Sequence, residues 1–225
     1  YLKMEYNSFT GSIPVTIGSL FKLKYIYLNS NLLSAPLPSS IASLGLLSYL
    51  YLNNNFLSQS LPSGLFTLPE VFHMFIDENM LNGTLPTTLG SMSSLRYMYF
   101  FSNSFSGRIP ESIGSLTNLE LMYLFNNALT STIPSSIGLL SQLTYFELAF
   151  NSLSGKIPES LGAITNLEYI YLNDNSLSGT LPGDIGDIPY LGVLKLNNND
   201  KISKNALLIF ILVFQNRIGS IAQYC

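Results

Sequence analysis

Residues 140–162 read LSQLTYFELAFNSLSGKIPESLG, and the pattern in this stretch organises the whole chain. Its framework is L-x-x-L-x-x-F-x-L-x-x-N-x-L-S-G-x-I-P-x-x-L-G, where x is variable. The same framework recurs every 24 residues along most of the sequence. Most of the chain therefore consists of copies of one 24-residue repeat.

Two series of residues confirm the register of this repeat. The asparagines recur at Asn7, Asn31, Asn55, Asn79, Asn103, Asn127, Asn151, Asn175 and Asn199. The prolines recur at Pro14, Pro38, Pro62, Pro86, Pro110, Pro134, Pro158 and Pro182. No insertion interrupts either series, so chance recurrence is excluded.

A fixed period of about 20–29 residues with this leucine and asparagine pattern is typical of a solenoid. We predict an α/β solenoid, a right-handed superhelix of about nine repeats over residues 1–199. A parallel sheet is expected on its concave face, and short 3-10 or helical turns on its convex side. Nine strands at about 4.8 Å spacing would line a surface roughly 40 Å long.

Each repeat is expected to open with a short strand in which apolar and variable residues alternate. The apolar pairs predicted to point inward are Leu2/Met4, Ile26/Leu28, Leu50/Leu52, Met74/Ile76, Met98/Phe100, Met122/Leu124, Phe146/Leu148, Ile170/Leu172 and Leu194/Leu196.

The residues after each strand have structural roles. The asparagine amide can both donate and accept, so it should satisfy buried backbone groups of neighbouring turns. The glycine permits a backbone conformation that other residues avoid, and the proline forces an extended residue before it. Ala35, Gln59 and Ser131 replace this glycine, and we expect local variation there.

The stretches LSGKIPESLG, LSGTLPGDIG and FSGRIPESIGSLTNL resemble the plant-type leucine-rich repeat. That class includes ectodomains of receptor-like proteins and kinases, and polygalacturonase-inhibiting proteins. The resemblance covers residues 1–199. It implies a second short strand at S-G-x-I-P, a twisted and curved solenoid, and a binding role without catalysis. Members usually carry cysteine-paired caps, whereas this chain has one cysteine, Cys225.

Composition narrows the functional classes. Charged residues make up 10% of the chain and the net charge is −3, which argues against a nucleic-acid partner. No nucleophile–base pair or phosphate loop emerges, so we expect neither an enzyme nor a cofactor. Tyr1 falls inside a repeat, and we expect a fragment or a processed product of extracellular or cell-surface location.

The repeat pattern stops after Asn199, and residues 200–225 are expected to form a non-repeat C-terminal cap or tail. The apolar run at 206–214 is shorter than the roughly 20 residues that a membrane span needs. A cap over the last repeat is the main interpretation, because solenoids need capped ends. A membrane-proximal stub and a segment foreign to the native fold are the alternatives.

The variable strand positions form two aromatic columns on the predicted concave face. The first column is Tyr25, Tyr49, His73, Tyr97, Leu121, Tyr145 and Tyr169. The second column is Tyr27, Tyr51, Phe75, Tyr99, Tyr123, Glu147 and Tyr171. Neighbouring rings in a column should pack on each other, either as a simple consequence of β-propensity or as a rigid binding platform.

The residues that flank the two columns are expected to differ between the ends and the middle of this face. The ends are expected to be polar, through Asn29, Asn53, Asn54, Asn173 and Asp174, and the middle apolar, through Phe101, Phe125 and Phe150. We expect the centre, residues 75–150, to make most partner contacts, because hot spots favour central aromatics.

Two further features stand out. Asp77 and Glu78 follow the strand that carries His73, the single histidine, and we interpret the three as an exposed polar cluster instead of a metal site. Asn82-Gly83-Thr84 is a glycosylation acceptor pattern, with Asn82 as the acceptor.

The leading functional hypothesis is a recognition module that binds a protein or peptide on the aromatic face. Carbohydrate recognition is the first alternative, since sugar rings can stack on tyrosines. A structural role in a larger assembly is the second alternative. Neither nucleic acid nor a metal is expected as a partner.

Overall fold

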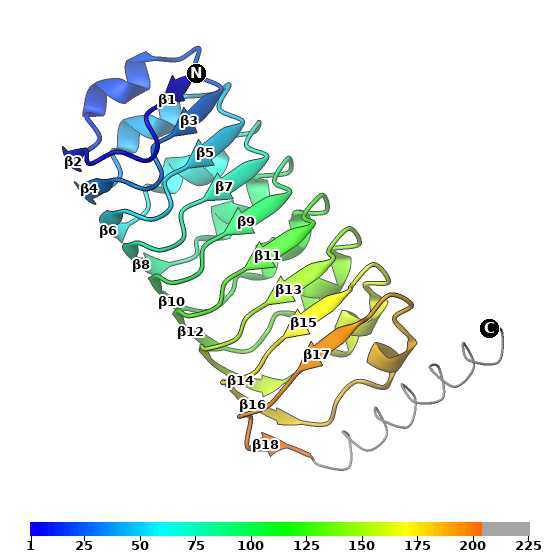
Figure 1. Cartoon of the computed structure of the whole chain (residues 1–225). Coiled ribbons are helices and arrows are strands. Elements are labelled where there is room, and N and C mark those ends of the chain that lie inside the picture. Colours follow the sequence, from blue (N-terminus) through cyan, green and yellow to red (C-terminus); the bar gives the residue numbers. More distant parts are fainter. Residues whose placement is uncertain (204–225) are drawn as a thin grey trace, which may run out of the picture.

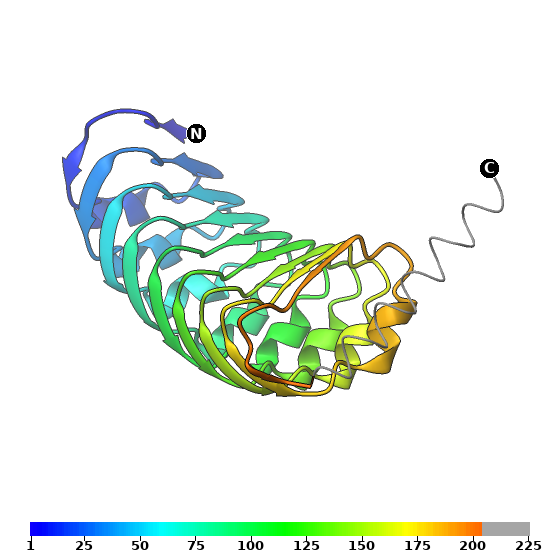
Figure 2. The same ribbon diagram turned by 60° about the horizontal axis from the view of Figure 1, so that its bottom comes forward.

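The computed structural model describes residues 1–203, which wind into a curved coil of stacked repeats. Each repeat contributes one strand to a first sheet, one strand to a second sheet and one 3-10 helix. Figure 2 shows the curvature, with the first sheet on the inner side of the arc. The predicted solenoid, with its concave parallel sheet and short helical turns on the opposite side, is confirmed.

The first sheet has nine strands, all parallel and in sequence order. They are β1 (Leu2–Lys3), β3 (Tyr25–Tyr27), β5 (Tyr49–Tyr51), β7 (His73–Phe75), β9 (Tyr97–Tyr99), β11 (Leu121–Tyr123), β13 (Tyr145–Glu147), β15 (Tyr169–Tyr171) and β17 (Val193–Lys195). Each residue pairs with the residue 24 positions later, as Met98 does with Met122. The repeat period is thus the register of the sheet.

The second sheet also has nine parallel strands, which overlap the start of the S-G-x-I-P segment where the family resemblance implied a second strand. They are β2 (Thr10–Gly11), β4 (Leu32–Ala35), β6 (Phe56–Ser60), β8 (Met80–Thr84), β10 (Ser104–Gly107), β12 (Ala128–Ser131), β14 (Ser152–Lys156), β16 (Ser176–Gly179) and β18 (Lys201–Ile202). The strand β18 pairs with β16 and lies beyond the predicted end of the repeats at Asn199. The rest of the predicted tail, 204–225, lies outside the described residues.

Eight 3-10 helices cover the side of the coil opposite the first sheet (Figure 1). They are η1 (Val15–Ser19), η2 (Ser39–Ser43), η3 (Ser63–Thr67), η4 (Thr87–Ser91), η5 (Glu111–Ser115), η6 (Ser135–Leu139), η7 (Glu159–Ala163) and η8 (Gly183–Asp187). Each begins directly after a repeat proline, whose fixed φ suits a helix start. The proline carbonyl accepts the first helical bond, as Pro14 O does from Ile17 N at 2.9 Å.

Small residues let neighbouring helices stack. A Cβ atom built on Gly90 would lie 2.3 Å from the backbone oxygen of Ser112 in the next coil, and one on Gly138 would lie 2.5 Å from that of Ser160. These separations are far inside van der Waals contact. Glycine at this place therefore sets the close approach of consecutive coils.

The core is continuous from the first coil to the last. The predicted inward residues of the central repeats are fully buried, with Met98, Met122 and Phe146 at 0% exposure. Leu2, Met4 and Leu194, near the ends of the described coil, are only partly buried. Burial of each central side chain contributes about 1.5–3 kcal/mol relative to exposure.

The asparagine series makes the bonds expected of it. Asn103 is typical, because its Nδ2 donates to the carbonyls of Ile76, Phe100 and Phe101 at 3.1–3.3 Å. Its Oδ1 accepts from the N–H of Leu81 at 3.0 Å. One amide thus ties two consecutive coils together, and the prediction of a structural role is confirmed.

The three repeats without glycine do not vary as expected. Ala35, Gln59 and Ser131 have φ values of 70°, 65° and 69°, the same left-handed region that Gly107 and Gly155 occupy. Each of the three pairs with the next strand of the second sheet, Ala35 with Leu57, Gln59 with Leu81 and Ser131 with Leu153, so the coil keeps this conformation whatever the side chain. The expectation of local variation is therefore wrong for the backbone at these positions.

This strain is testable with a reciprocal pair of variants. Ser131→Gly should raise the free energy of unfolding by about 0.5–1 kcal/mol, because glycine removes the cost of a left-handed L-residue. Gly155→Ala should lower it, since the new Cβ would also lie 2.8 Å from Thr132 Cγ2. Thermal unfolding followed by circular dichroism measures both. A loss of stability in Ser131→Gly would contradict the explanation.

Candidate functional site: an aromatic face on the inner sheet

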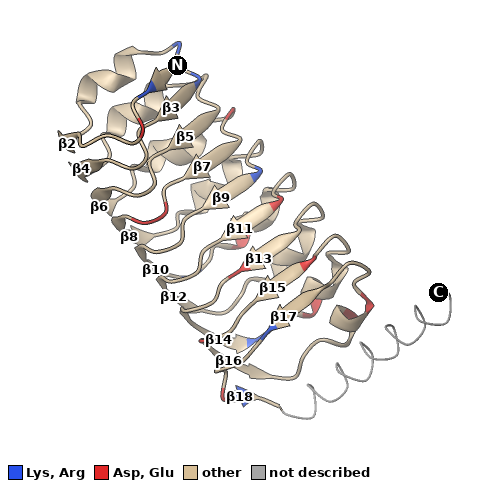
Figure 3. Ribbon diagram, in the orientation of Figure 1, with Lys and Arg blue, Asp and Glu red and all other residues tan. Residues whose placement is uncertain are grey.

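The first sheet presents the two predicted columns on its solvent side. In strands β3 to β15 the central residue is buried and its two neighbours are half-buried. This alternation places the first-column and second-column residues together on the inner face of the arc. The charged positions on this face are few (Figure 3).

Ring contacts run along both columns. In the first column the ring centroids are 4.8 Å apart for Tyr25–Tyr49, 4.5 Å for Tyr49–His73 and 4.4 Å for His73–Tyr97. In the second column they are 4.8 Å apart for Tyr27–Tyr51, 4.4 Å for Tyr51–Phe75, 4.1 Å for Phe75–Tyr99 and 4.5 Å for Tyr99–Tyr123. These separations lie at the short end of the range for favourable aromatic pairs or slightly below it, so the rings are closely packed.

Each column is interrupted once, and the ring series passes from one column to the other at that point. The first column is broken by Leu121 and the second by Glu147. Tyr123 of the second column contacts Tyr145 of the first at 4.7 Å, and Tyr145 continues to Tyr169 at 4.9 Å and to Tyr171 at 5.5 Å. The aromatic series is therefore continuous across the sheet.

The rings are packed more deeply than an open wall of tyrosines would be. All first-column and second-column residues are half-buried. Burial raises the pKa of Tyr51 to about 12, and burial also raises the pKa of Tyr99. The hydroxyls therefore stay protonated and act as hydrogen-bond donors near neutral pH.

The predicted apolar middle is present in part. Phe101 and Phe125 stack at 4.5 Å with an interplanar angle of 8°, beside the second column. Phe150 lies past the strand in a turn, with φ of 54° and 55% of its side chain exposed. It stands apart from the stacked rings, and its left-handed conformation is unfavourable for a bulky residue.

The sequence pattern missed some members of the face. Tyr1 stacks on Tyr25 at 4.4 Å and extends the first column. Lys3 and Lys195 lie at the two ends of the second column, with Nζ atoms 5.3 Å from the Tyr27 ring and 5.0 Å from the Tyr171 ring. Tyr1, Lys3 and Lys195 lie one 24-residue period from Tyr25, Tyr27 and Tyr171, so the repeat period alone could have identified them.

The polar groups near His73 are paired. The Tyr51 hydroxyl lies 2.9 Å from His73 Nδ1, within hydrogen-bond distance. Burial lowers the pKa of His73, so the ring is neutral near neutral pH. Arg96 and Glu120 form an ion pair at 3.1 Å at the strand starts.

The expected exposed cluster of His73, Asp77 and Glu78 is wrong in one member. Asp77 is only 4% exposed, whereas Glu78 is exposed in a turn with φ of 51°. Burial raises the pKa of Asp77 to about 7, and its Oδ1 has no hydrogen-bond partner. Among residues 1–203 no group of three metal-ligating side chains comes together.

Some of the polar residues predicted at the two ends of the aromatic face are buried. Asn29 and Asn173 are buried at their strand ends, whereas Asp174 is half-buried. These amides therefore offer less to a partner than the alternation suggests. Asn82, the predicted glycosylation acceptor, is exposed on β8 in the second sheet, away from the aromatic columns.

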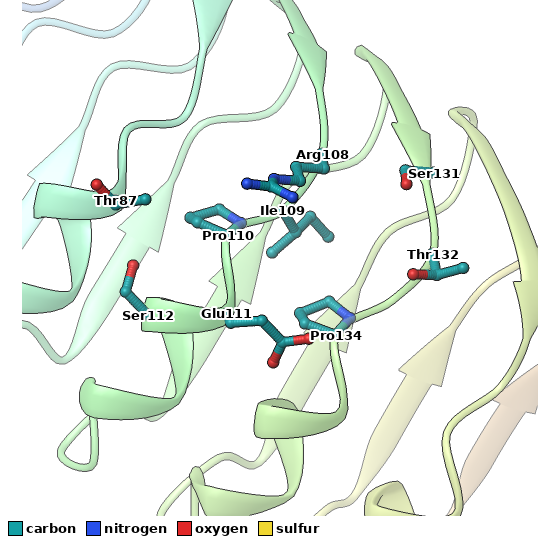
Figure 4. Close-up of a pocket in the computed structure, with 9 residues that line it drawn as sticks. All are labelled: Thr87, Arg108, Ile109, Pro110, Glu111, Ser112, Ser131, Thr132 and Pro134. Carbon is teal, nitrogen blue, oxygen red and sulfur yellow. The ribbon is translucent and has the colours of Figure 1, made fainter.

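A separate small hollow lies on the flank between the second sheet and the 3-10 helices. Its volume is about 220 Å³, and Arg108, Glu111, Ser131 and Thr132 contribute to its lining. Figure 4 shows these side chains spread over two consecutive coils and the start of η5. The hollow is remote from the aromatic face and holds no grouping with evident chemistry.

Stacked parallel coils, an asparagine series and a sheet-lined concave face define a leucine-rich-repeat solenoid. The Leucine Rich Repeat family model matches residues 22–44, 46–68, 94–116, 118–140, 142–164 and 166–188. The chain belongs to this family, and its repeats are of the plant type. A comparison with curated protein sequences finds no significant match.

Solved structures of plant receptors are similar to this chain. The Arabidopsis receptor kinase HAESA, solved with the peptide hormone IDA and the co-receptor SERK1, is 34% identical with a TM-score of 0.86. The match covers 88% of this chain and 33% of HAESA. The ectodomain of GASSHO1/SCHENGEN3 from Arabidopsis thaliana, in complex with CASPARIAN STRIP INTEGRITY FACTOR 2, is 32% identical with a TM-score of 0.87, over 93% of this chain and 25% of that one.

The similarity extends beyond plants. A leucine-rich-repeat protein of Leptospira interrogans is 28% identical with a TM-score of 0.78, over 90% of this chain and 50% of its own. The chain thus spans a third or less of the two plant receptors and half of the bacterial protein. Within residues 1–203 no helix is long and apolar enough to cross a membrane.

Proposed function

We propose that this chain is a non-catalytic recognition module that binds a peptide or protein partner on its aromatic inner face. The observation that carries the proposal is the continuous series of packed rings from Tyr1 to Tyr171, held on a rigid parallel sheet. Rigid aromatic side chains supply contact area at low entropic cost. The similar plant ectodomains, solved with peptide hormones, support the same class of partner and an extracellular location.

The proposed contact residues are the half-buried rings of both columns with their aromatic flank. They are Tyr25, Tyr27, Tyr49, Tyr51, Phe75, Tyr97, Tyr99, Phe101, Tyr123, Phe125, Tyr145, Phe150, Tyr169 and Tyr171. The centre, residues 75–150, is proposed to contribute most of the binding energy, because central desolvated aromatics dominate interfaces.

Ring orientation favours a peptide over a sugar. Tyr51 and Phe75 stack with an interplanar angle of 4°, and Phe101 and Phe125 with one of 8°. The stacked faces of these rings are used by their neighbours along the column, so ring edges remain for a partner. A sugar that stacks on tyrosine needs a free ring face, whereas a peptide can use edges and hydroxyl donors.

The test is selection of random twelve-residue peptides on the immobilised chain, followed by affinity measurements with variants. Tyr99→Ala combined with Tyr123→Ala should weaken the selected peptides by about thirtyfold, because it removes a central ring pair whose centroids are 4.5 Å apart. Tyr190→Ala is the matched control, since Tyr190 is 68% exposed and lies outside the first sheet.

The outcomes separate the hypotheses. Unchanged affinity in the double variant, with circular dichroism showing an intact fold, would overturn the assignment of the inner face. Binding on a glycan array that the double variant loses, with no peptide selected, would instead identify a carbohydrate-binding face.

A further inference from the structure

Glu147 is an unusual residue in the second column. The equivalent positions in the coils on either side hold Tyr123 and Tyr171, which pair with Glu147 in the sheet register. Tyr145, on the same strand, contacts both of these rings, at 4.7 Å and 5.5 Å. Three tyrosines therefore surround one half-buried carboxylate on the inner face.

This carboxylate has no partner within the described chain. The Glu147 carboxylate makes no hydrogen bond or ion pair with any of residues 1–203, whereas the Glu120 carboxylate at the strand start is paired with Arg96. The cation that acts on it is Lys195, whose Nζ lies over the Tyr171 ring. Burial raises the pKa of Glu147 to about 7, and the opposing effect of the Lys195 charge is the smaller one.

One of the neighbouring rings already accepts a cation. Lys195 Nζ lies 5.0 Å from the Tyr171 ring centre, and Lys3 Nζ lies 5.3 Å from that of Tyr27 at the other end of the column. A cation over a tyrosine face is stabilised by the ring quadrupole. A carboxylate beside such rings adds a charge-assisted hydrogen bond, which is stronger than a neutral one.

We infer that Glu147, Tyr123, Tyr145 and Tyr171 form a subsite for one basic side chain, lysine or arginine, of the peptide partner. The inference rests on the proposed peptide-binding function and specifies the chemistry of one partner residue. A tyrosine at position 147 would complete the column and avoid a half-buried unpaired charge. Charge complementarity therefore favours a cationic side chain at this carboxylate.

The experiment uses the random twelve-residue peptides selected on the intact chain. Peptides selected on the wild type should share a lysine or arginine at one aligned position, and peptides selected on Glu147→Gln should lack that preference. Glu120→Gln is the matched control, because its carboxylate is already paired with Arg96. It should select the same basic residue as the wild type.

Affinities of one selected peptide and its basic-residue-to-glutamine version, for wild type and Glu147→Gln, then form a double-mutant cycle. We expect each single change to weaken binding about tenfold and the second change to add less than threefold. Additive effects, or selected peptides without a shared basic residue, would overturn the subsite while leaving peptide binding intact. Selection of no peptide at all would overturn the proposed function and the subsite together.

Discussion

Replacing Asn55 with alanine should lower the free energy of unfolding by about 3–4 kcal/mol. The Asn55 side chain is 5% exposed and holds two coils together. Its Nδ2 donates to the carbonyls of Leu28, Leu52 and Asn53 at 3.0–3.3 Å, and its Oδ1 accepts from Leu33 N–H at 3.0 Å. Alanine would leave these buried groups without that partner, and each unsatisfied group costs about 1–3 kcal/mol.

Urea denaturation followed by circular dichroism measures this loss. Asn118→Ala is the control, because Asn118 is exposed and makes a single bond, from Nδ2 to the Ser93 carbonyl at 2.8 Å. That variant should lose less than about 1 kcal/mol. An Asn55→Ala loss no larger than that of Asn118→Ala would show that water replaces the amide, and the structural role of the series would be refuted.

The period of the sequence was enough to predict the solenoid, the inward residues and the asparagine bonds. These features depend only on the spacing of 24 residues, because every coil places the same position against its equivalent in the next coil. Met98, Met122 and Phe146 are buried because they hold the same apolar strand position in successive coils. Alternation along the strands likewise placed the two aromatic columns on one face.

Features that depend on how individual side chains fit were not predictable from the period. The contact between Tyr123 and Tyr145 crosses the columns because Leu121 and Glu147 interrupt them in adjacent coils. The burial of Asp77 contradicts the simple outward position that alternation assigns to it. How deeply a side chain at the strand end is buried depends on the turn geometry and on neighbouring coils, which the repeat pattern does not encode.

Asp77→Asn should raise the free energy of unfolding at pH 8 by about 4 kcal/mol and leave it nearly unchanged at pH 4. Burial raises the pKa of Asp77 from 3.8 to about 7 in the folded chain. Between these values the folded state holds a proton that the unfolded state has released, so stability falls as pH rises through this window. Each pKa unit corresponds to about 1.4 kcal/mol, and the 4% exposure leaves little screening by solvent.

Asparagine fits this position, since Asn29, Asn53 and Asn173 occupy it in other repeats. Denaturation curves at pH 4, 6 and 8 should show that the free energy of unfolding of the wild type falls as pH rises. The fall should be smaller in Asp77→Asn. Part of the decline should remain, because burial also raises the pKa of Glu147 to about 7. Glu78→Gln is the control, as Glu78 is the exposed neighbour and should leave the wild-type decline in place. If Asp77→Asn instead lost stability at pH 8, the carboxylate would have to be ionised and well paired in the folded chain. Asp77 would then be a structural anion and not the destabilising group that its unpartnered Oδ1 indicates.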